Sequence, residues 1–116
     1  MDSCIFCKIG RGEIPSKKVY EDDEVIAFHD IRPIAPVHFM VVPKPHVASL
    51  AEVSEQHQSL MGKMMVLASR LAREQGCVDG YRTIINTGRV GGQEVHHLHM
   101  HVIGGSEPLG PMLVRR

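Results

Sequence analysis

The spacing of hydrophobic positions changes along the chain, and each spacing predicts a different element. Apolar side chains at helical intervals in residues 4–10 predict a short helical turn. Apolar runs at 17–20 and 25–29, separated by the acidic turn 21–24, predict a β-hairpin. A third strand is expected at 38–42, because prolines bound this apolar run on both sides.

The strongest helical pattern opens the second half of the chain. Ser54 is a suitable N-cap, and apolar residues recur at three- and four-residue steps from Leu60 until Gly76. Two further strands are expected at 81–86 and 97–103. One long helix between runs of strands favours an α+β fold with a mainly antiparallel sheet.

The last predicted strand carries a histidine at every second position. Side chains alternate across a strand, so His97, His99 and His101 are expected on one face, with Leu98 and Met100 on the core face. The row fits three interpretations: polar positions of a half-exposed strand, a zinc site of three histidines, or a nucleophile with supporting groups. Neighbours on one face lie about 7 Å apart, which places three in a row too far apart for a single ion. In the third interpretation the nucleophile is His99.

Several other polar residues have both a chemical and a structural interpretation. The glycine-rich loop at 91–94 can direct backbone N–H groups at phosphate oxygens, or can simply turn the chain. Asp30 can accept ribose hydroxyls or cap a turn. His38 can orient another imidazole or lie satisfied in the core, and Asn86 can donate to phosphate or form a turn.

The pair Cys4 and Cys7 has the C-x-x-C spacing of a metal or redox element. A closed tetrahedral zinc site needs two more ligands, for which His46 and His97 are the natural candidates. A redox dithiol is the alternative, but it normally follows a strand in a βαβ unit, and no strand is expected before Cys4. Cys77 is interpreted as a bystander at the end of the helix.

The composition restricts the class of protein. A chain of 116 residues suits a single domain, 1–116. The segment 104–116 is expected to form an irregular arm that packs against another surface, such as a second subunit. Disorder of this segment is the alternative. Lys plus Arg and Asp plus Glu number 13 each, so no nucleic-acid or membrane partner is indicated. We expect a cytoplasmic protein, because three cysteines fit a reducing compartment and neither a membrane span nor a signal region is evident.

Residues 97–103 match the alternation of histidines and apolar residues that defines the histidine triad (HIT) nucleotide-binding proteins. The chain resembles this family along nearly its whole length, and its ending at 104–112 is most similar to the bacterial Hint branch. The other matching segments are 5–9, 13–15, 20–23, 27–31, 35–44, 81–86 and 91–95. The resemblance implies the HIT fold, a five-stranded antiparallel sheet with one long and one short N-terminal helix, paired in a homodimer into a ten-stranded sheet.

The same resemblance implies binding of purine nucleoside monophosphates and hydrolysis of the P–N bond in nucleoside 5′-phosphoramidates. His99 aligns with the nucleophile that accepts the nucleotidyl group, His101 with a donor to the α-phosphate, and His38 and His97 with supporting histidines. Asp30 aligns with the ribose-binding carboxylate. The positions aligned with phosphate contacts are Asn86, Gln93, Glu94 and Val95, and those aligned with apolar walls around the base are Ile5, Phe6, Ile9, Phe28 and Ile31.

A zinc-bearing subset of the family resembles the chain in its cysteine pair, which implies structural Zn²⁺ on Cys4, Cys7, His46 and His97. Animal relatives carry serine at the position of Glu94, and the chain has no Trp, so recognition of the leaving group stays open. Alternatives on the same scaffold are a dinucleotide polyphosphate hydrolase or nucleotidyl transferase and a non-catalytic nucleotide-binding partner protein. A metal-dependent hydrolase is a further alternative.

Overall fold

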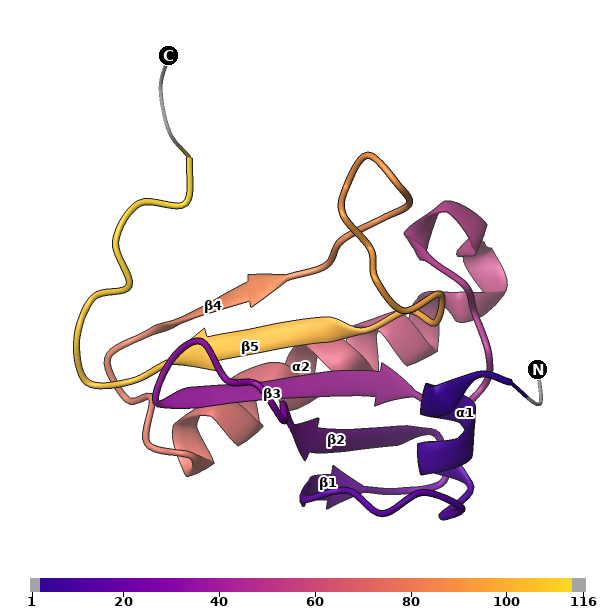
Figure 1. Cartoon of the computed structure of the whole chain (residues 1–116), viewed down its shortest axis with the longest axis horizontal. Coiled ribbons are helices and arrows are strands. Elements are labelled where there is room, and N and C mark those ends of the chain that lie inside the picture. The colour runs from indigo at the N-terminus through magenta and orange to yellow at the C-terminus, as the bar shows by residue number, and fades with distance from the viewer. Residues whose placement is uncertain (1–2, 114–116) are drawn as a thin grey trace.

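The structure, a computed structural model, describes residues 3–113 and forms one antiparallel sheet flanked by helices. Its five strands run in the order β1-β2-β3-β5-β4 (Figure 1). The elements are α1 (Ile5–Gly10), β1 (Lys18–Glu21), β2 (Val25–His29), β3 (Val37–Pro43), α2 (Gln58–Glu74), β4 (Tyr81–Ile84) and β5 (Met100–Gly104). The predicted α+β class and antiparallel sheet are confirmed. Pairing of two subunits into a ten-stranded sheet stays a prediction.

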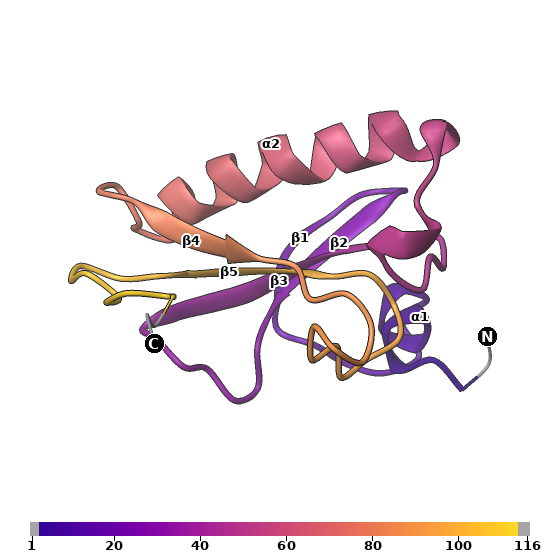
Figure 2. The same ribbon diagram turned by 90° about the horizontal axis from the view of Figure 1, so that it is seen from above.

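Helix α2 lies along one face of the sheet and α1 against the opposite face (Figure 2). Strand β3 serves both layers, since Phe39 and Val41 pack in the cluster under α2 while Met40 and Val42 pack in the cluster with α1. This is the alternation expected of a strand buried on both sides. Because Met40 pairs with His101 in the register of β3 and β5, the histidine row belongs to the α1 side.

The predicted strand over 97–103 is wrong at its start, because β5 begins only at Met100. Before that residue the backbone makes other bonds: the N–H of Leu98 donates to the carbonyl of Val47 (2.7 Å). The carbonyl of Pro43, at the end of β3, accepts a hydrogen bond from the His97 ring (2.7 Å). The groups that would continue the β3–β5 ladder are therefore occupied elsewhere. Leu98 and Met100 are fully buried, and so is His97.

Other boundaries also differ from the sequence prediction, by one or two residues in β1, in β3 and at the end of α2 and by more at the start of α2. Ser54 caps a short 3₁₀ turn, Glu55–His57, and α2 follows it from Gln58. The side chain of His57 accepts from the backbone N–H of Ser54 at 3.0 Å, so the pair forms a capping box. Strand β4 ends at Ile84, two residues earlier than expected.

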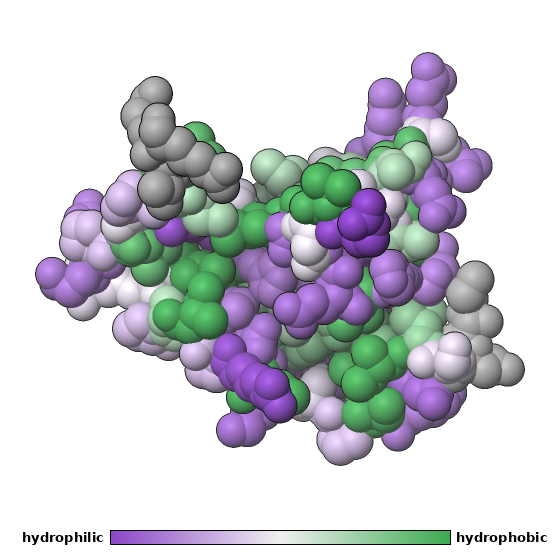
Figure 3. All heavy atoms as spheres, turned by 45° about the horizontal axis from the view of Figure 1, so that its top comes forward, coloured by the Kyte–Doolittle hydropathy of each residue, from purple (hydrophilic) through white to green (hydrophobic). Residues whose placement is uncertain are grey.

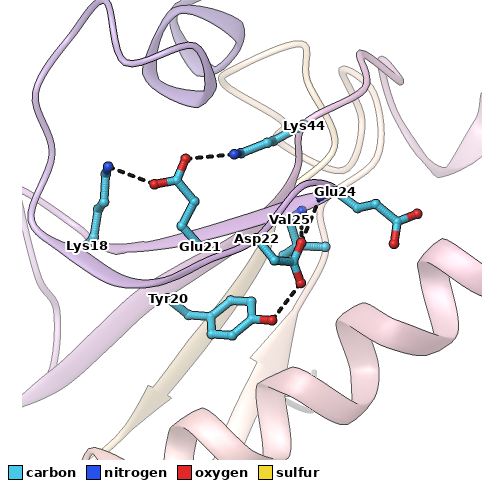
Figure 4. Close-up of polar contacts among 7 residues, drawn as sticks. All are labelled: Lys18, Tyr20, Glu21, Asp22, Glu24, Val25 and Lys44. Carbon is cyan, nitrogen blue, oxygen red and sulfur yellow. Dashed lines mark hydrogen bonds and ion pairs between the residues drawn. The ribbon is translucent and has the colours of Figure 1, made fainter.

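The hairpin turn between β1 and β2 is held by one carboxylate (Figure 4). Asp22 accepts hydrogen bonds from the Tyr20 hydroxyl (2.6 Å) and from the backbone N–H groups of Glu24 (2.8 Å) and Val25 (2.9 Å). It also pairs with Lys63 of α2 at 2.6 Å. Burial raises the pKa of Asp22, yet these hydrogen bonds outweigh it and hold the pKa well below its usual range.

Asp22→Ala is expected to lower the free energy of unfolding by about 1–2 kcal/mol, because four donors lose one acceptor. Since folding lowers the pKa of Asp22, its stabilisation is present above about pH 4 and is lost as the pH falls further. Urea unfolding of the variant at pH 7 and pH 3 measures both effects. The control is Asp23→Ala, in the same turn but exposed, and an equal loss in both variants would contradict the assignment.

Gly104, the first residue of the predicted arm, belongs to β5, and the chain from 105 to 113 has no helix or strand. Arg82 of β4 donates to the carbonyl of Gly110, while Met112 and Leu113 are 56% and 86% exposed. Residues 114–116 lie outside the described part of the chain. In the view of Figure 3 hydrophobic residues form separate groups among hydrophilic ones. Among the described residues, no helix is both long and apolar enough to cross a membrane.

Candidate active site and metal centre

Three histidine rings and one carboxylate meet on the sheet face opposite α2. The His101 ring centroid lies 5.1 Å from that of His99 and 5.1 Å from that of His38. Asp30, at the end of β2, brings its carboxylate to 3.4 Å from Nε2 of His38. Strands β2, β3 and β5 are neighbours in the sheet, so residues distant in sequence converge at one point. The predicted catalytic residues are thus brought together.

A hydrogen-bond relay fixes which nitrogen of His101 carries the proton. The backbone N–H of Ile34 donates to Nδ1 of His38 (3.2 Å), which leaves the ring hydrogen of His38 on Nε2. This Nε2–H donates to Nδ1 of His101 at 2.9 Å. The hydrogen of a neutral His101 then lies on its other nitrogen, Nε2. His101 is therefore presented as a donor to a ligand.

Burial keeps both rings of this relay neutral near pH 7. It is the main cause that lowers the pKa of His38, partly opposed by the negative charge of Asp30. Burial likewise lowers the pKa of His101, reinforced by His99 and His38 and opposed by Asp30 and Glu94. The relay of single donors and acceptors requires these neutral forms, so the electrostatics and the geometry agree.

His99 is held in the opposite tautomer. Its Nδ1–H donates to the backbone carbonyl of His97 at 2.7 Å, so the lone pair of the neutral ring lies on Nε2. The side chain is 7% exposed, and the ring of Phe6 packs edge-on against it at a centroid distance of 5.1 Å. A neutral imidazole with a fixed orientation and a free Nε2 is suited to nucleophilic attack.

A cavity of about 720 Å³ opens beside this group. Four residues predicted to contact a nucleoside line it: Ile9, Phe28, Asp30 and Ile31. Ile5 and Phe6 are not among its lining residues, since Ile5 is 46% exposed and Phe6 lies buried against the histidines. A smaller cavity of about 280 Å³ beside the C-terminal arm is lined by none of the predicted site residues.

Asp30 has the turn role weighed from the sequence, and its ribose-binding role stays a prediction. Its Oδ1 accepts the backbone N–H of Arg32 at 2.7 Å, which closes a turn, while Oδ2 faces His38. The residue also lines the large cavity. A turn aspartate that is fixed in this way can still present its second oxygen to a ligand.

The glycine-rich loop has a backbone that only glycine accommodates well. Gly88 and Gly92 have φ values of 69° and 79°, and a Cβ on Gly91 would lie 2.4 Å from the carbonyl oxygen of Thr87. The buried Gln93 closes the loop from within: its Oε1 accepts the N–H of Gly88 at 2.9 Å.

The amide nitrogen of Gln93 completes this closure by donating to the carbonyls of Ala48 (2.7 Å) and Val95 (3.0 Å). All its hydrogen-bonding groups are thus engaged with the backbone, whereas the sequence suggested a phosphate contact. No sequence signal separates these two roles. The other residues expected near phosphate are Asn86 and Val95, both half-buried, and the exposed Glu94.

The predicted metal ligands form a second cluster behind His99. One ligand atom from each of Cys4, Cys7, His46 and His97 lies within 4.8 Å of all the others. Nδ1 of His97 lies 3.3 Å from Sγ of Cys4 and 3.5 Å from that of Cys7, and Nδ1 of His46 lies 3.3 Å from Sγ of Cys7. Zinc bound tetrahedrally by sulfur and nitrogen holds such atoms about 3.6 Å apart. The donor set and its spacing therefore fit Zn²⁺.

The outer contacts of His97 support the same conclusion. Its Nε2–H donates to the carbonyl of Pro43 at 2.7 Å, which directs the lone pair of Nδ1 toward the two cysteines. Metal-bound histidines in proteins are oriented in this way by their second nitrogen. Nδ1 of His97 thus faces the cysteines. Of the three histidines that meet near Asp30, His38 lines the cavity.

Comparisons with known proteins agree with this geometry. The sequence profile of the HIT domain matches residues 11–108. The chain is 48% identical over 116 residues to the purine nucleoside phosphoramidase of Escherichia coli strain K12, covering 99% of this chain and 97% of that protein. It is 53% identical over 104 residues to protein HitA of Neisseria gonorrhoeae, covering 90% and 97%.

Solved structures give the same result at the level of the fold. A HIT family hydrolase from Clostridium thermocellum superposes with a TM-score of 0.92 at 41% identity, covering 98% of this chain and 99% of that one. A histidine triad protein from Clostridium difficile gives a TM-score of 0.88 at 47% identity, with 96% of each chain covered. The similarity therefore extends well beyond the histidine row.

Proposed function

The chain belongs to the HIT domain family, and from this premise we propose that it hydrolyses the P–N bond of purine nucleoside 5′-phosphoramidates through a nucleotidyl-histidine intermediate. The observation that carries the proposal is the pair of opposite tautomers at the site. His99 has a free Nε2 while His101 has an Nε2–H, so a nucleophile and a donor lie side by side. The relative named purine nucleoside phosphoramidase supports the choice of bond.

The reaction proceeds in two displacements at phosphorus. Nε2 of neutral His99 attacks in line, a P–N bond to the ring forms, and the P–N bond to the leaving amine breaks. The amine departs with the electron pair of that bond and takes up one proton. Water then attacks the phosphorus, a P–O bond forms as the P–N bond to Nε2 of His99 breaks, and the proton that the water loses balances the one taken up by the amine. Neutral His99 and a nucleoside 5′-monophosphate are released.

The surrounding groups stabilise charge and hold the nucleotide. The Nε2–H of His101 donates to a non-bridging phosphate oxygen, and the backbone N–H groups of Glu94 and Val95 add further donors. His38 maintains the tautomer of His101. The 720 Å³ cavity accepts the nucleoside, with Phe28 and Ile31 on its apolar walls and Asp30 placed for the ribose hydroxyls.

The same proposal assigns structural Zn²⁺ to the cysteine and histidine cluster and a homodimer to the assembly. When bound, zinc supplies a cross-link between α1, the segment after β3 and the start of the histidine row. The donor set has no position left for substrate, because Cys4, Cys7, His46 and His97 provide four ligands. A closed site of this kind argues against hydrolysis at this metal.

A two-substrate comparison tests the proposed function. Purified, zinc-loaded protein is expected to release AMP from adenosine 5′-phosphoramidate with a kcat/KM at least about a hundredfold above that for diadenosine tetraphosphate, a difference of about 3 kcal/mol in transition-state binding. Product release followed by chromatography measures both rates. A preference for diadenosine tetraphosphate would reverse the assignment in favour of a dinucleotide polyphosphate hydrolase. Binding of AMP without turnover of either substrate would favour a nucleotide-binding partner protein.

A further inference from the structure

The metal cluster and the proposed nucleophile share two groups. The carbonyl that fixes the tautomer of His99 belongs to His97, which is also a candidate metal ligand. Between the two cysteines in sequence lies Phe6, whose ring packs edge-on against both His97, at 5.9 Å, and His99, at 5.1 Å. A metal that holds the cluster together therefore also holds Phe6 and the carbonyl of His97 next to His99.

We propose that Phe6 is a positioning residue for His99, and that a metal bound by Cys4, Cys7, His46 and His97 keeps it in place. The inference deepens the proposed function and rests on it, since it concerns the same nucleophile. Phe6 is 6% exposed and is not among the residues that line the 720 Å³ cavity. It acts through the imidazole it touches.

Helix α1 depends on the cluster for its position. It has six residues, too few for an isolated helix to be stable in water. Its N-cap is Cys4, whose Sγ accepts the backbone N–H of Cys7 at 3.4 Å. A metal bound to both sulfurs fixes the first turn of α1 at the residues on either side of Phe6. The direction of the Phe6 side chain is then set by the metal centre.

The aromatic contacts of Phe6 show how the direction of its side chain affects His99. The ring stands at 87° to the ring of His99 and at 73° to that of Phe28, so it fills the space between the histidine row and a wall of the nucleoside cavity. Within the described residues 3–113, His99 makes one ring hydrogen bond, to the carbonyl of His97, and rotation of the imidazole about its Cβ–Cγ bond would break it. The packed Phe6 ring restricts that rotation.

A second route connects the cluster with the phosphate side of the site. The ligand His46 begins a short segment whose next two carbonyls accept hydrogen bonds from the site: that of Val47 from the N–H of Leu98 and that of Ala48 from the amide of Gln93, each at 2.7 Å. Holding His46 therefore also holds the glycine-rich loop and the start of the row. The metal centre thus connects α1, the segment that begins at His46 and the start of the histidine row.

Phe6→Leu tests the positioning role while leaving all four candidate ligands in place. Long-range ¹H–¹⁵N spectra of the imidazole rings report the tautomer of His99, which is assigned by comparison with His99→Asn. We expect one Nδ1–H tautomer in the zinc-loaded protein and a mixture in Phe6→Leu. We also expect kcat for adenosine 5′-phosphoramidate to fall about tenfold with KM changed less than threefold, because small displacements of a reacting group lower the rate at this scale.

The control is Ile26→Val, which shortens a buried side chain in the same apolar cluster as Phe6. Ile26 lies on β2, which β3 separates from β5. Thermal unfolding of this variant calibrates the effect of a smaller core side chain alone, and its His99 spectrum is expected to match the wild type. A Phe6→Leu protein with an unchanged His99 spectrum and unchanged kcat would overturn the proposal. The spectra need no substrate, so they decide the positioning role even where the wild-type protein fails to hydrolyse phosphoramidates.

Coupling between the metal and the nucleotide supplies an independent measurement. If zinc orders the site, zinc must raise AMP affinity by the same factor by which AMP raises zinc affinity. We expect a factor of about ten, measured as AMP titrations with and without zinc and as zinc transfer to a chromogenic chelator with and without AMP. Equal AMP affinity in the two forms, or zinc transfer unaffected by AMP, would overturn the role of the metal. Complete loss of turnover in zinc-free protein with an unchanged His99 spectrum would also overturn it, and would point to a metal that acts on the substrate.

Discussion

His99→Asn is expected to lower kcat for adenosine 5′-phosphoramidate by at least about 10³-fold, because the covalent route requires the Nε2 lone pair. The asparagine amide can still donate to the carbonyl of His97, as Nδ1 does in the native protein at 2.7 Å. The cavity and the relay that presents His101 are left intact. AMP affinity is therefore expected to stay within about threefold of the wild type, since the groups proposed to hold the nucleotide are unchanged.

Steady-state kinetics and AMP titration of the same preparation separate the two effects. A matched control is His96→Asn, which changes an exposed histidine of the same run and is expected to leave both constants unchanged. Wild-type protein that is quenched during turnover with denaturant at alkaline pH, where the P–N bond of a nucleotidyl-histidine persists, is expected to carry an added nucleotidyl mass on His99, and the variant none. Turnover by His99→Asn at the wild-type rate would remove the covalent mechanism while leaving the family and fold as they are.

The sequence predicted those parts of the fold that depend on local periodicity. Strand β2 was expected at 25–29 and is observed over Val25–His29. An apolar run bounded by a turn and a proline-rich segment is typical of a strand. The sequence prediction failed where a backbone group bonds to a side chain or to a distant carbonyl instead of to the neighbouring strand. The start of β5 moved to Met100 for this reason, since the N–H of Leu98 bonds to Val47.

The same distinction separates the parts of the site that were found from those that were missed. The cluster of two cysteines and two histidines was identified because ligand chemistry restricts the choice of residues. The closure of the loop by Gln93 and the contact of Phe6 with His99 were not, because both depend on contacts between segments distant in sequence. Periodicity describes a segment by itself and carries no information on which segments meet.

Removing one ligand of the metal centre is expected to have the second large effect. Cys7→Ala should abolish stoichiometric zinc binding and lower Tm by about 15 °C relative to zinc-loaded wild type. A bound metal at a thousand times its dissociation constant stabilises the native state by about 4 kcal/mol, and each kcal/mol shifts Tm of a domain of this size by about 4 °C. Cys7 is 7% exposed and approaches both histidines of the cluster, so its loss leaves the remaining ligands with an incomplete shell.

Elemental analysis and thermal unfolding with and without a chelator measure this effect, and Cys77→Ala is the control. Cys77 is also buried, at 1% exposed, but it lies against Gly104 and outside the cluster. Both variants lose a buried sulfur, so a fall in Tm common to both reflects packing. The informative quantity is the Tm difference produced by the chelator, expected to persist in Cys77→Ala and to vanish in Cys7→Ala. A chelator effect of equal size in both variants would place the metal elsewhere, and would separate His97 from the cysteines toward which its Nδ1 points.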